Sequence, residues 1–134
     1  MTEFNLSNAV TLFCPQSSSI NSLWAVYVAA TFATASYGLS QQDLHAGVVL
    51  AISLGFSVFA LCHWSLVMQA LRINRTLGSE INAHLEQNKN AAFAASLRCL
   101  TRSANPYWIS LSAHVIIDVC VLAALWNRVG WSLH

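Results

Sequence analysis

Three long runs of apolar residues, separated by polar segments, dominate the pattern of the sequence. They are Leu23–Leu39, which Ile20 extends, Ala46–Leu71 and Tyr107–Trp126, and none of them contains lysine or arginine. About 20 helical residues cross the hydrocarbon core of a bilayer, which is about 30 Å thick. Tryptophan and tyrosine lie near the ends of the runs, as they do in the aromatic belts of membrane proteins. The pattern therefore predicts three transmembrane helices.

The polar segment after the second run keeps a helical pattern. Its apolar positions recur every four residues, at Ile73, Leu77, Ile81 and Leu85. Residues 87–90 (QNKN) predict a turn, and residues 91–101 present a second apolar face. We expect the second membrane helix to project about 24 Å into the cytoplasm, at 1.5 Å per residue, before a helix returns. Residues 72–105 are thus predicted to form a helical hairpin.

The first twenty residues have a weaker pattern. Apolar residues at Phe4, Leu6, Val10 and Phe13 predict a short amphipathic helix that lies on the inner leaflet and stops at Pro15. The polar residues 16–19 (QSSS) then predict a linker. The expected organisation is an interfacial segment (1–20), transmembrane helices 1 and 2 (21–71), the cytoplasmic basic hairpin (72–105), and transmembrane helix 3 with the C-terminal tail (106–134).

The composition supports a membrane protein. Of the 134 residues, 8% are charged and 56% are hydrophobic, whereas soluble domains have about 25% charged residues. The N-terminus lacks the basic start and apolar core of a signal peptide, so we expect the first run to be a retained anchor. The four cysteines form no C-x-x-C pair and predict free, packed thiols. The predicted fold class is an all-α membrane protein.

The basic residues determine the expected orientation and one candidate site. Five of the six lie in the hairpin: Arg72, Arg75, Lys89, Arg98 and Arg102. By the positive-inside rule the hairpin and the N-terminus are cytoplasmic and the C-terminus is outside the inner membrane, although Arg128 then faces outward. The charge either signals topology and contacts anionic lipid, or binds an anionic ligand such as a nucleotide or a short single-stranded DNA. Phe93 is the one aromatic residue that the hairpin offers for base stacking.

The third run contains three polar residues on one helical face. Ser110, His114 and Asp118 follow one another at spacings of four. A charge buried in hydrocarbon costs several kcal/mol without a partner, so we expect this polar stripe to face another helix, another copy or water. His63 and His114 are predicted to lie at the same depth, about 13 Å from the cytoplasmic edge. On that scale, Asp118 is expected opposite Thr34 and Phe59.

Several chemistries fit these residues. A serine-hydrolase triad is disfavoured because three residues stacked on one helix do not give its geometry. A metal site of His63, His114 and Asp118, haem ligation by the two histidines, a bonded His114–Asp118 pair, and a water-filled path between copies all stay open. Rows of small residues, such as Ala25, Ala29 and Ala33, allow close helix approach either within one chain or between copies.

We favour the water-filled path, in a symmetric homo-oligomer of four or more copies. Three helices enclose too little volume for a pore of their own. We therefore predict an ion channel rather than an enzyme, with no catalytic residue, metal or cofactor. The alternative is a small haem-binding or accessory subunit of a membrane redox complex.

The run CPQSSSINSLWAVYVAATFATASYGLS at residues 14–40, followed by the extended second helix, the basic hairpin and a third span, resembles a known architecture. It is similar to the small three-helix bacterial membrane effectors of anti-phage defence, above all to the membrane effector of the Hailong system. The resemblance implies an oligomeric ion channel. A DNA oligomer made by a partner nucleotidyltransferase holds such a channel shut, and phage activity opens it by removing the oligomer. The likeness covers the architecture of the chain and assigns no ligand-contacting residue.

Overall fold

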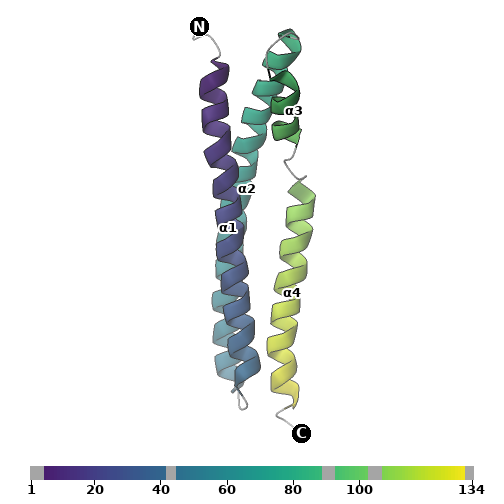
Figure 1. Cartoon of the computed structure of the whole chain (residues 1–134). Helices are drawn as coiled ribbons and strands as arrows, with labels where there is room; N and C mark the ends of the chain where they lie inside the picture. Colours follow the sequence, from purple (N-terminus) through teal and green to yellow (C-terminus); the bar gives the residue numbers. More distant parts are fainter. Residues whose placement is uncertain (1–4, 42–44, 89–92, 103–106, 132–134) are drawn as a thin grey trace.

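The computed structural model describes residues 5–41, 45–88, 93–102 and 107–131 of the chain. These residues form four helices and no strand: α1 (Leu6–Ser40), α2 (Ala46–Gln87), α3 (Ala94–Arg102) and α4 (Tyr107–Trp131). Helices α1 and α2 run side by side in opposite directions, α3 lies against the far end of α2, and α4 lines up beside the rest of the pair (Figure 1). The predicted all-helical class is confirmed.

The N-terminal part of the chain differs from the sequence prediction. Helix α1 runs without a break from Leu6 to Ser40, and Pro15 lies inside it. The predicted helix stop at Pro15 and the linker at residues 16–19 are therefore wrong. Phe13 and Ile20 are buried against α2, so one face of this stretch packs on protein.

Matched polar contacts explain why α1 continues through the QSSS segment. The side-chain amide of Gln16 donates to the carbonyl oxygen of Ala70 at 3.3 Å, and the Ser17 hydroxyl donates to Oδ1 of Asn74 at 3.0 Å. Asn74 is 4% exposed. Its partner Ser17 lies on the face of α1 that contacts α2, where apolar residues make the contact on either side of it. Hydrophobic periodicity alone misses such a position because the polar residues satisfy each other.

Ser17 therefore contributes to stability although it lies in a serine-rich stretch. We expect Ser17→Ala to lower the free energy of unfolding by about 1–2 kcal/mol, because it leaves the buried Asn74 amide without its partner. Ser19→Ala is the matched control, since Ser19 is exposed on the same helix. Unfolding in mixed detergent micelles measures both. Equal effects would show that residues 16–19 behave as the linker that the sequence predicted.

The extension of α2 and the returning helix agree with the predicted hairpin. Helix α2 continues to Gln87, so at 1.5 Å per residue its 42 residues exceed the thickness of a bilayer core by about 30 Å. Helix α3 packs on this extension, where the Thr101 hydroxyl donates to Oδ1 of Asn82 at 2.9 Å. At Gly78 the backbone of α2 lies close to both Phe13 of α1 and Thr101 of α3. The base of the hairpin is thereby held between two other helices.

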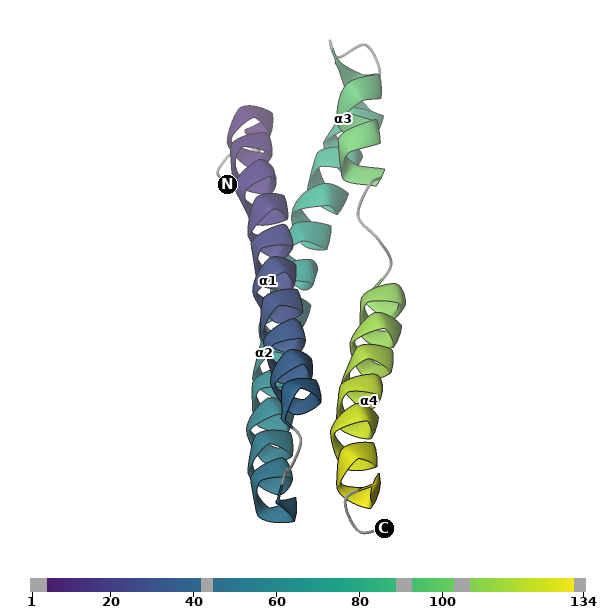
Figure 2. The ribbon, with the colours of Figure 1, turned by 60° about the horizontal axis from the view of Figure 1, so that its bottom comes forward.

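Two helices are apolar and long enough to cross a membrane, α2 and the Trp108–Asn127 part of α4, among the residues that the structure describes. Helix α1 packs against both of them, and the three helices lie along one another in Figure 2. Val49, Phe56, Val121 and Leu125 form a buried core between α2 and α4. A third span by α1 stays a prediction.

The surface of the bundle is apolar. Ala25, Ala29 and Ala33 are all exposed, so this row of small residues does not serve packing within one chain. The four cysteines are free, as predicted, but they are exposed rather than packed in the core. A thiol behaves as a small hydrophobic group, so an apolar outer surface accommodates it.

Candidate functional site

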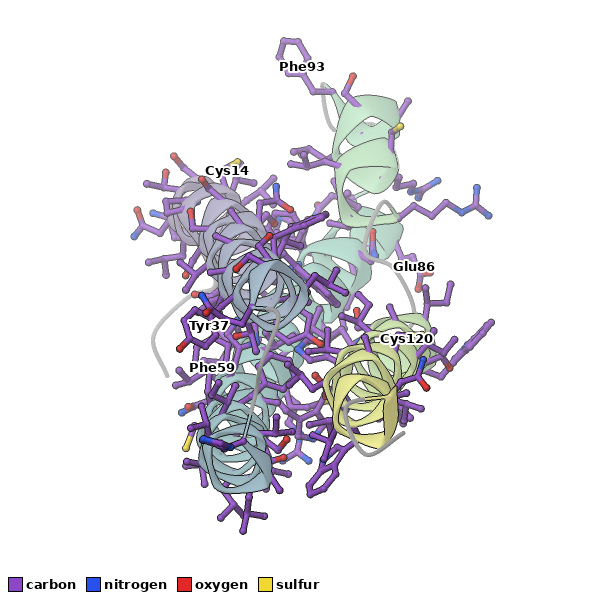
Figure 3. All side chains as sticks on the ribbon, turned by 90° about the horizontal axis from the view of Figure 1, so that it is seen from below. Cys14, Tyr37, Phe59, Glu86, Phe93 and Cys120 are labelled. Atoms are coloured by element: carbon purple, nitrogen blue, oxygen red, sulfur yellow. The ribbon has the colours of Figure 1, made fainter. Side chains whose placement is uncertain are left out.

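The polar stripe of α4 faces the inside of the bundle. Ser110 is 8% and His114 is 2% exposed, and Asp118 is half-buried. The expectation that this face avoids lipid is therefore met within a single chain. Phe59 of α2, labelled in Figure 3, belongs to the same central region, where side chains of three helices meet.

The two histidines contact each other directly. Nδ1 of His63 lies 3.1 Å from Nε2 of His114, and the rings are stacked with centroids 5.3 Å apart. The other nitrogen of His63 bonds the carbonyl oxygen of Leu23 on α1 at 2.8 Å, and the other nitrogen of His114 bonds the carbonyl oxygen of Ser110 at 3.3 Å. The pair thus joins α1, α2 and α4. His63 and His114 therefore lie level with each other along the bundle, and their depth in a membrane stays a prediction.

Asp118 pairs with a tyrosine that the sequence analysis did not single out. The hydroxyl of Tyr27 donates to Oδ1 of Asp118 at 2.7 Å, and it also lies 3.3 Å from the carbonyl oxygen of His114. Tyr27 is 0% exposed, and the centroid of its ring lies 4.0 Å from that of His114. The alternative of a bonded His114–Asp118 pair is not found, because His114 contacts His63 and Asp118 contacts Tyr27.

The partner of Asp118 on α1 also corrects the predicted register. Thr34 was expected opposite Asp118, on the assumption that the helix starts after a linker. Because α1 is continuous, Leu23 lies level with His63, and Tyr27, one turn later, reaches Asp118. The shift amounts to nearly two helical turns.

Aromatic rings enclose the two histidines. Trp24 of α1 lies with its ring centroid 4.6 Å from that of His114, and the ring of Trp64 on α2 meets His114 edge-on at 5.6 Å. Phe59 stacks on both Tyr27 and His63. These rings keep water away from the buried face of the pair, which strengthens its electrostatic interactions.

This geometry does not fit the haem and metal alternatives. Each nitrogen of His63 already bonds a protein atom, and the facing nitrogens are 3.1 Å apart, which leaves no space for a haem plane between the rings. Asp118 points at Tyr27 rather than toward the histidine nitrogens. No group of three or more histidine, cysteine or acidic side chains is placed to hold a metal ion in the described segments.

A groove between α2 and α4 gives Asp118 access to the outside of the bundle. Its volume is about 350 Å³, and its walls are mostly apolar, with Phe56 and Leu122 at one part and Trp64 at another. Ser57, His114 and Asp118 contribute the polar part of the lining. Ser110 does not line the groove.

The basic residues of the predicted anion site lie at two separate hollows. Arg72 and Arg75 lie with Trp64 at a hollow of about 510 Å³ on α2. Arg98 and Arg102 border a hollow of about 660 Å³ between α2 and α3, together with Asn82 and Glu86. Lys89 lies outside the described residues.

The two hollows differ as anion sites. The carboxylate of Glu86 disfavours an anion beside Arg98 and Arg102.

The aromatic residue noted for base stacking, Phe93, is 79% exposed and projects away from the helices (Figure 3).

The sequence analysis missed Tyr27, Trp24 and Trp64. Tyr27 places a hydroxyl group within the apolar run of α1. A buried tyrosine hydroxyl usually has a hydrogen-bond partner. This requirement was the signal in the sequence that could have paired Tyr27 with Asp118. Trp64 directly follows His63 and lines both the groove and the Arg72 hollow. Spacing along one helix does not show such contacts between helices.

Comparison of the chain with protein-family models, with curated proteins and with solved structures finds no match.

Proposed function

We propose that the chain is one subunit of a homo-oligomeric ion channel in the bacterial inner membrane, gated by an anionic cytosolic ligand. The observation that carries the proposal is Asp118, a half-buried carboxylate that opens onto an outward-facing groove on membrane-compatible helices. A carboxylate at that level requires a cation, water or a polar partner on its open side.

The interior of one chain is too well filled to conduct. Tyr27 and Val49 are 0% exposed and Leu125 is 1% exposed, so side chains close the space between α1, α2 and α4. An ion path must therefore lie between copies, with the groove of each copy facing it. Asp118 then attracts cations, as carboxylate rings do in cation channels. His114 lies behind it, and Ser110 supplies a carbonyl oxygen that fixes the His114 ring.

The proposed gate is at the cytosolic end of the groove. Trp64 lines the Arg72 hollow on one side and the Asp118 groove on the other, and its ring touches His114. An anion such as a nucleotide or a short single-stranded DNA would pair with Arg72 and Arg75 and press on Trp64. The role in anti-phage defence rests on the resemblance of the architecture and belongs to this proposal.

Ion flux from liposomes tests the channel. We expect purified protein to conduct monovalent cations, and Asp118→Asn to lower the cation flux about tenfold, which corresponds to about 1.4 kcal/mol in the barrier. Glu80→Gln is the control, since it removes an exposed carboxylate of α2 outside the groove. Single-stranded DNA oligomers or nucleotides on the cytosolic side are expected to reduce the flux, and less so in Arg72→Gln/Arg75→Gln.

Two outcomes would contradict the proposal. One is the absence of flux under every ligand condition, combined with a monomer in mild detergent. The other is equal flux in Asp118→Asn and the wild type, which would remove Asp118 from the path.

A further inference from the structure

The hydrogen bonds of His63 and His114 determine where their protons lie. A carbonyl oxygen accepts hydrogen bonds and never donates them. His63 Nε2 faces the carbonyl oxygen of Leu23 at 2.8 Å, and His114 Nδ1 faces the carbonyl oxygen of Ser110 at 3.3 Å. Both carbonyl contacts are therefore satisfied together only when each of these nitrogens carries a hydrogen.

The two remaining nitrogens face each other at 3.1 Å. A neutral imidazole has one N–H, and in both rings the carbonyl contacts already use it. Two neutral rings would therefore point lone pairs at each other in a site where His63 is 4% and His114 is 2% exposed. One additional proton turns this repulsion into a hydrogen bond. We infer that His63 and His114 form a binding site for one shared proton, as an imidazolium–imidazole pair of charge +1.

Two neighbouring groups offset part of the cost of burying that charge. The face of the Tyr27 ring lies near His114, with centroids 4.0 Å apart, and aromatic faces attract cations at such distances. Asp118, one helical turn along α4, supplies the opposite charge, and the Tyr27 hydroxyl holds its Oδ1 in place at 2.7 Å. The other rings that pack on the pair, Trp24 of α1 and Trp64 of α2, carry no charge. The carboxylate and the protonated pair together are neutral.

The shared proton joins three helices. With it bound, the Leu23 carbonyl of α1, His63 of α2 and His114 of α4 form one chain of hydrogen bonds that continues to Ser110. Without it, one of the three contacts must be given up, because only two N–H groups remain. Proton occupancy thus controls how firmly α4 is held against α1 and α2. This inference does not depend on ion conduction.

Nitrogen NMR of the wild-type protein tests the proton count. With ¹⁵N-histidine in detergent micelles at neutral pH, we expect three of the four ring nitrogens of the pair to carry protons. We also expect a scalar coupling between His63 Nδ1 and His114 Nε2 across the shared hydrogen. The spectrum of His63→Gln assigns the signals, and His45→Gln identifies an exposed ring outside the site. Only one proton on each ring, with or without the coupling, would overturn the inference.

The pH dependence of unfolding is the second readout. Above about pH 7.5 the solvated histidines of the unfolded chain are neutral. If the folded pair keeps one proton there, the unfolding equilibrium constant rises about tenfold for each pH unit until the pair releases it. His63→Gln replaces the ring with an amide that donates or accepts without titrating, so its constant should lack this rise, whereas His45→Gln should keep it. The same alkaline dependence in the wild type and His63→Gln would also overturn the inference.

Discussion

Replacing Tyr27 with phenylalanine is expected to lower the free energy of unfolding by about 1.5–3 kcal/mol, the range for a hydrogen bond to a charged group. The substitution removes one oxygen atom and keeps the ring. Its hydroxyl is the donor to Oδ1 of Asp118 at 2.7 Å, so the change leaves a half-buried carboxylate without that partner. The ring still stacks on His63 and keeps its tilted contact with His114, which restricts the effect to the lost hydrogen bond.

Tyr37→Phe is the matched control on the same helix. Tyr37 is 48% exposed, so removal of its hydroxyl is expected to change stability by less than about 0.5 kcal/mol. Titration with a denaturing detergent, followed by tryptophan fluorescence, compares the two variants. A Tyr27→Phe protein as stable as Tyr37→Phe would mean that Asp118 does not depend on the tyrosine.

The double variant Tyr27→Phe/Asp118→Asn distinguishes the pair from its separate members. An asparagine has no charge to leave unpaired, so the loss from Tyr27→Phe should be smaller in that background. This result does not depend on the channel proposal, which concerns the effect of Asp118 on ion flux rather than on the free energy of unfolding.

Helices α2, α3 and α4 could be predicted from the sequence because each follows a local pattern. The apolar positions of Ile73 to Leu85 continue the second run, and α2 extends to Gln87 as that pattern predicted. In the sequence, Asn105 and Pro106 directly precede Tyr107, the first residue of α4. Proline is common at the start of helices, so this pair predicted where α4 begins.

The pairing between helices could not be read in the same way. Gln16 and Ser17 look like a linker unless Asn74, more than fifty residues away, is known to face them. Because a linker was predicted at residues 16–19, the first membrane helix was expected to begin after it, and this shifted the expected level of every residue in α1. Thr34 was therefore expected opposite Asp118, where Tyr27 lies. His63 and His114 were matched correctly because both depths were measured from neighbouring polar residues on their own helices.

The close approach of α1 and α4 near the far end of the bundle gives the last prediction. Gly38 is buried, and a Cβ atom there would overlap the Leu125 side chain of α4. Leu125 is 1% exposed and belongs to the core with Val49, Phe56 and Val121, so it has no free space to move into. We expect Gly38→Val to lower the free energy of unfolding by about 1–3 kcal/mol, the cost of overpacking a filled core.

Gly55→Val separates this steric effect from the change in backbone flexibility. Gly55 lies within α2, and nothing lies within 4 Å of a Cβ atom built there. Valine has a higher helix propensity than glycine, so this variant should be as stable as the wild type or slightly more stable. The double variant Gly38→Val/Leu125→Ala should lose less than the sum of its single changes, because the smaller side chain makes room for the added methyl groups. Additive losses would mean that α4 does not lie against α1 at Gly38.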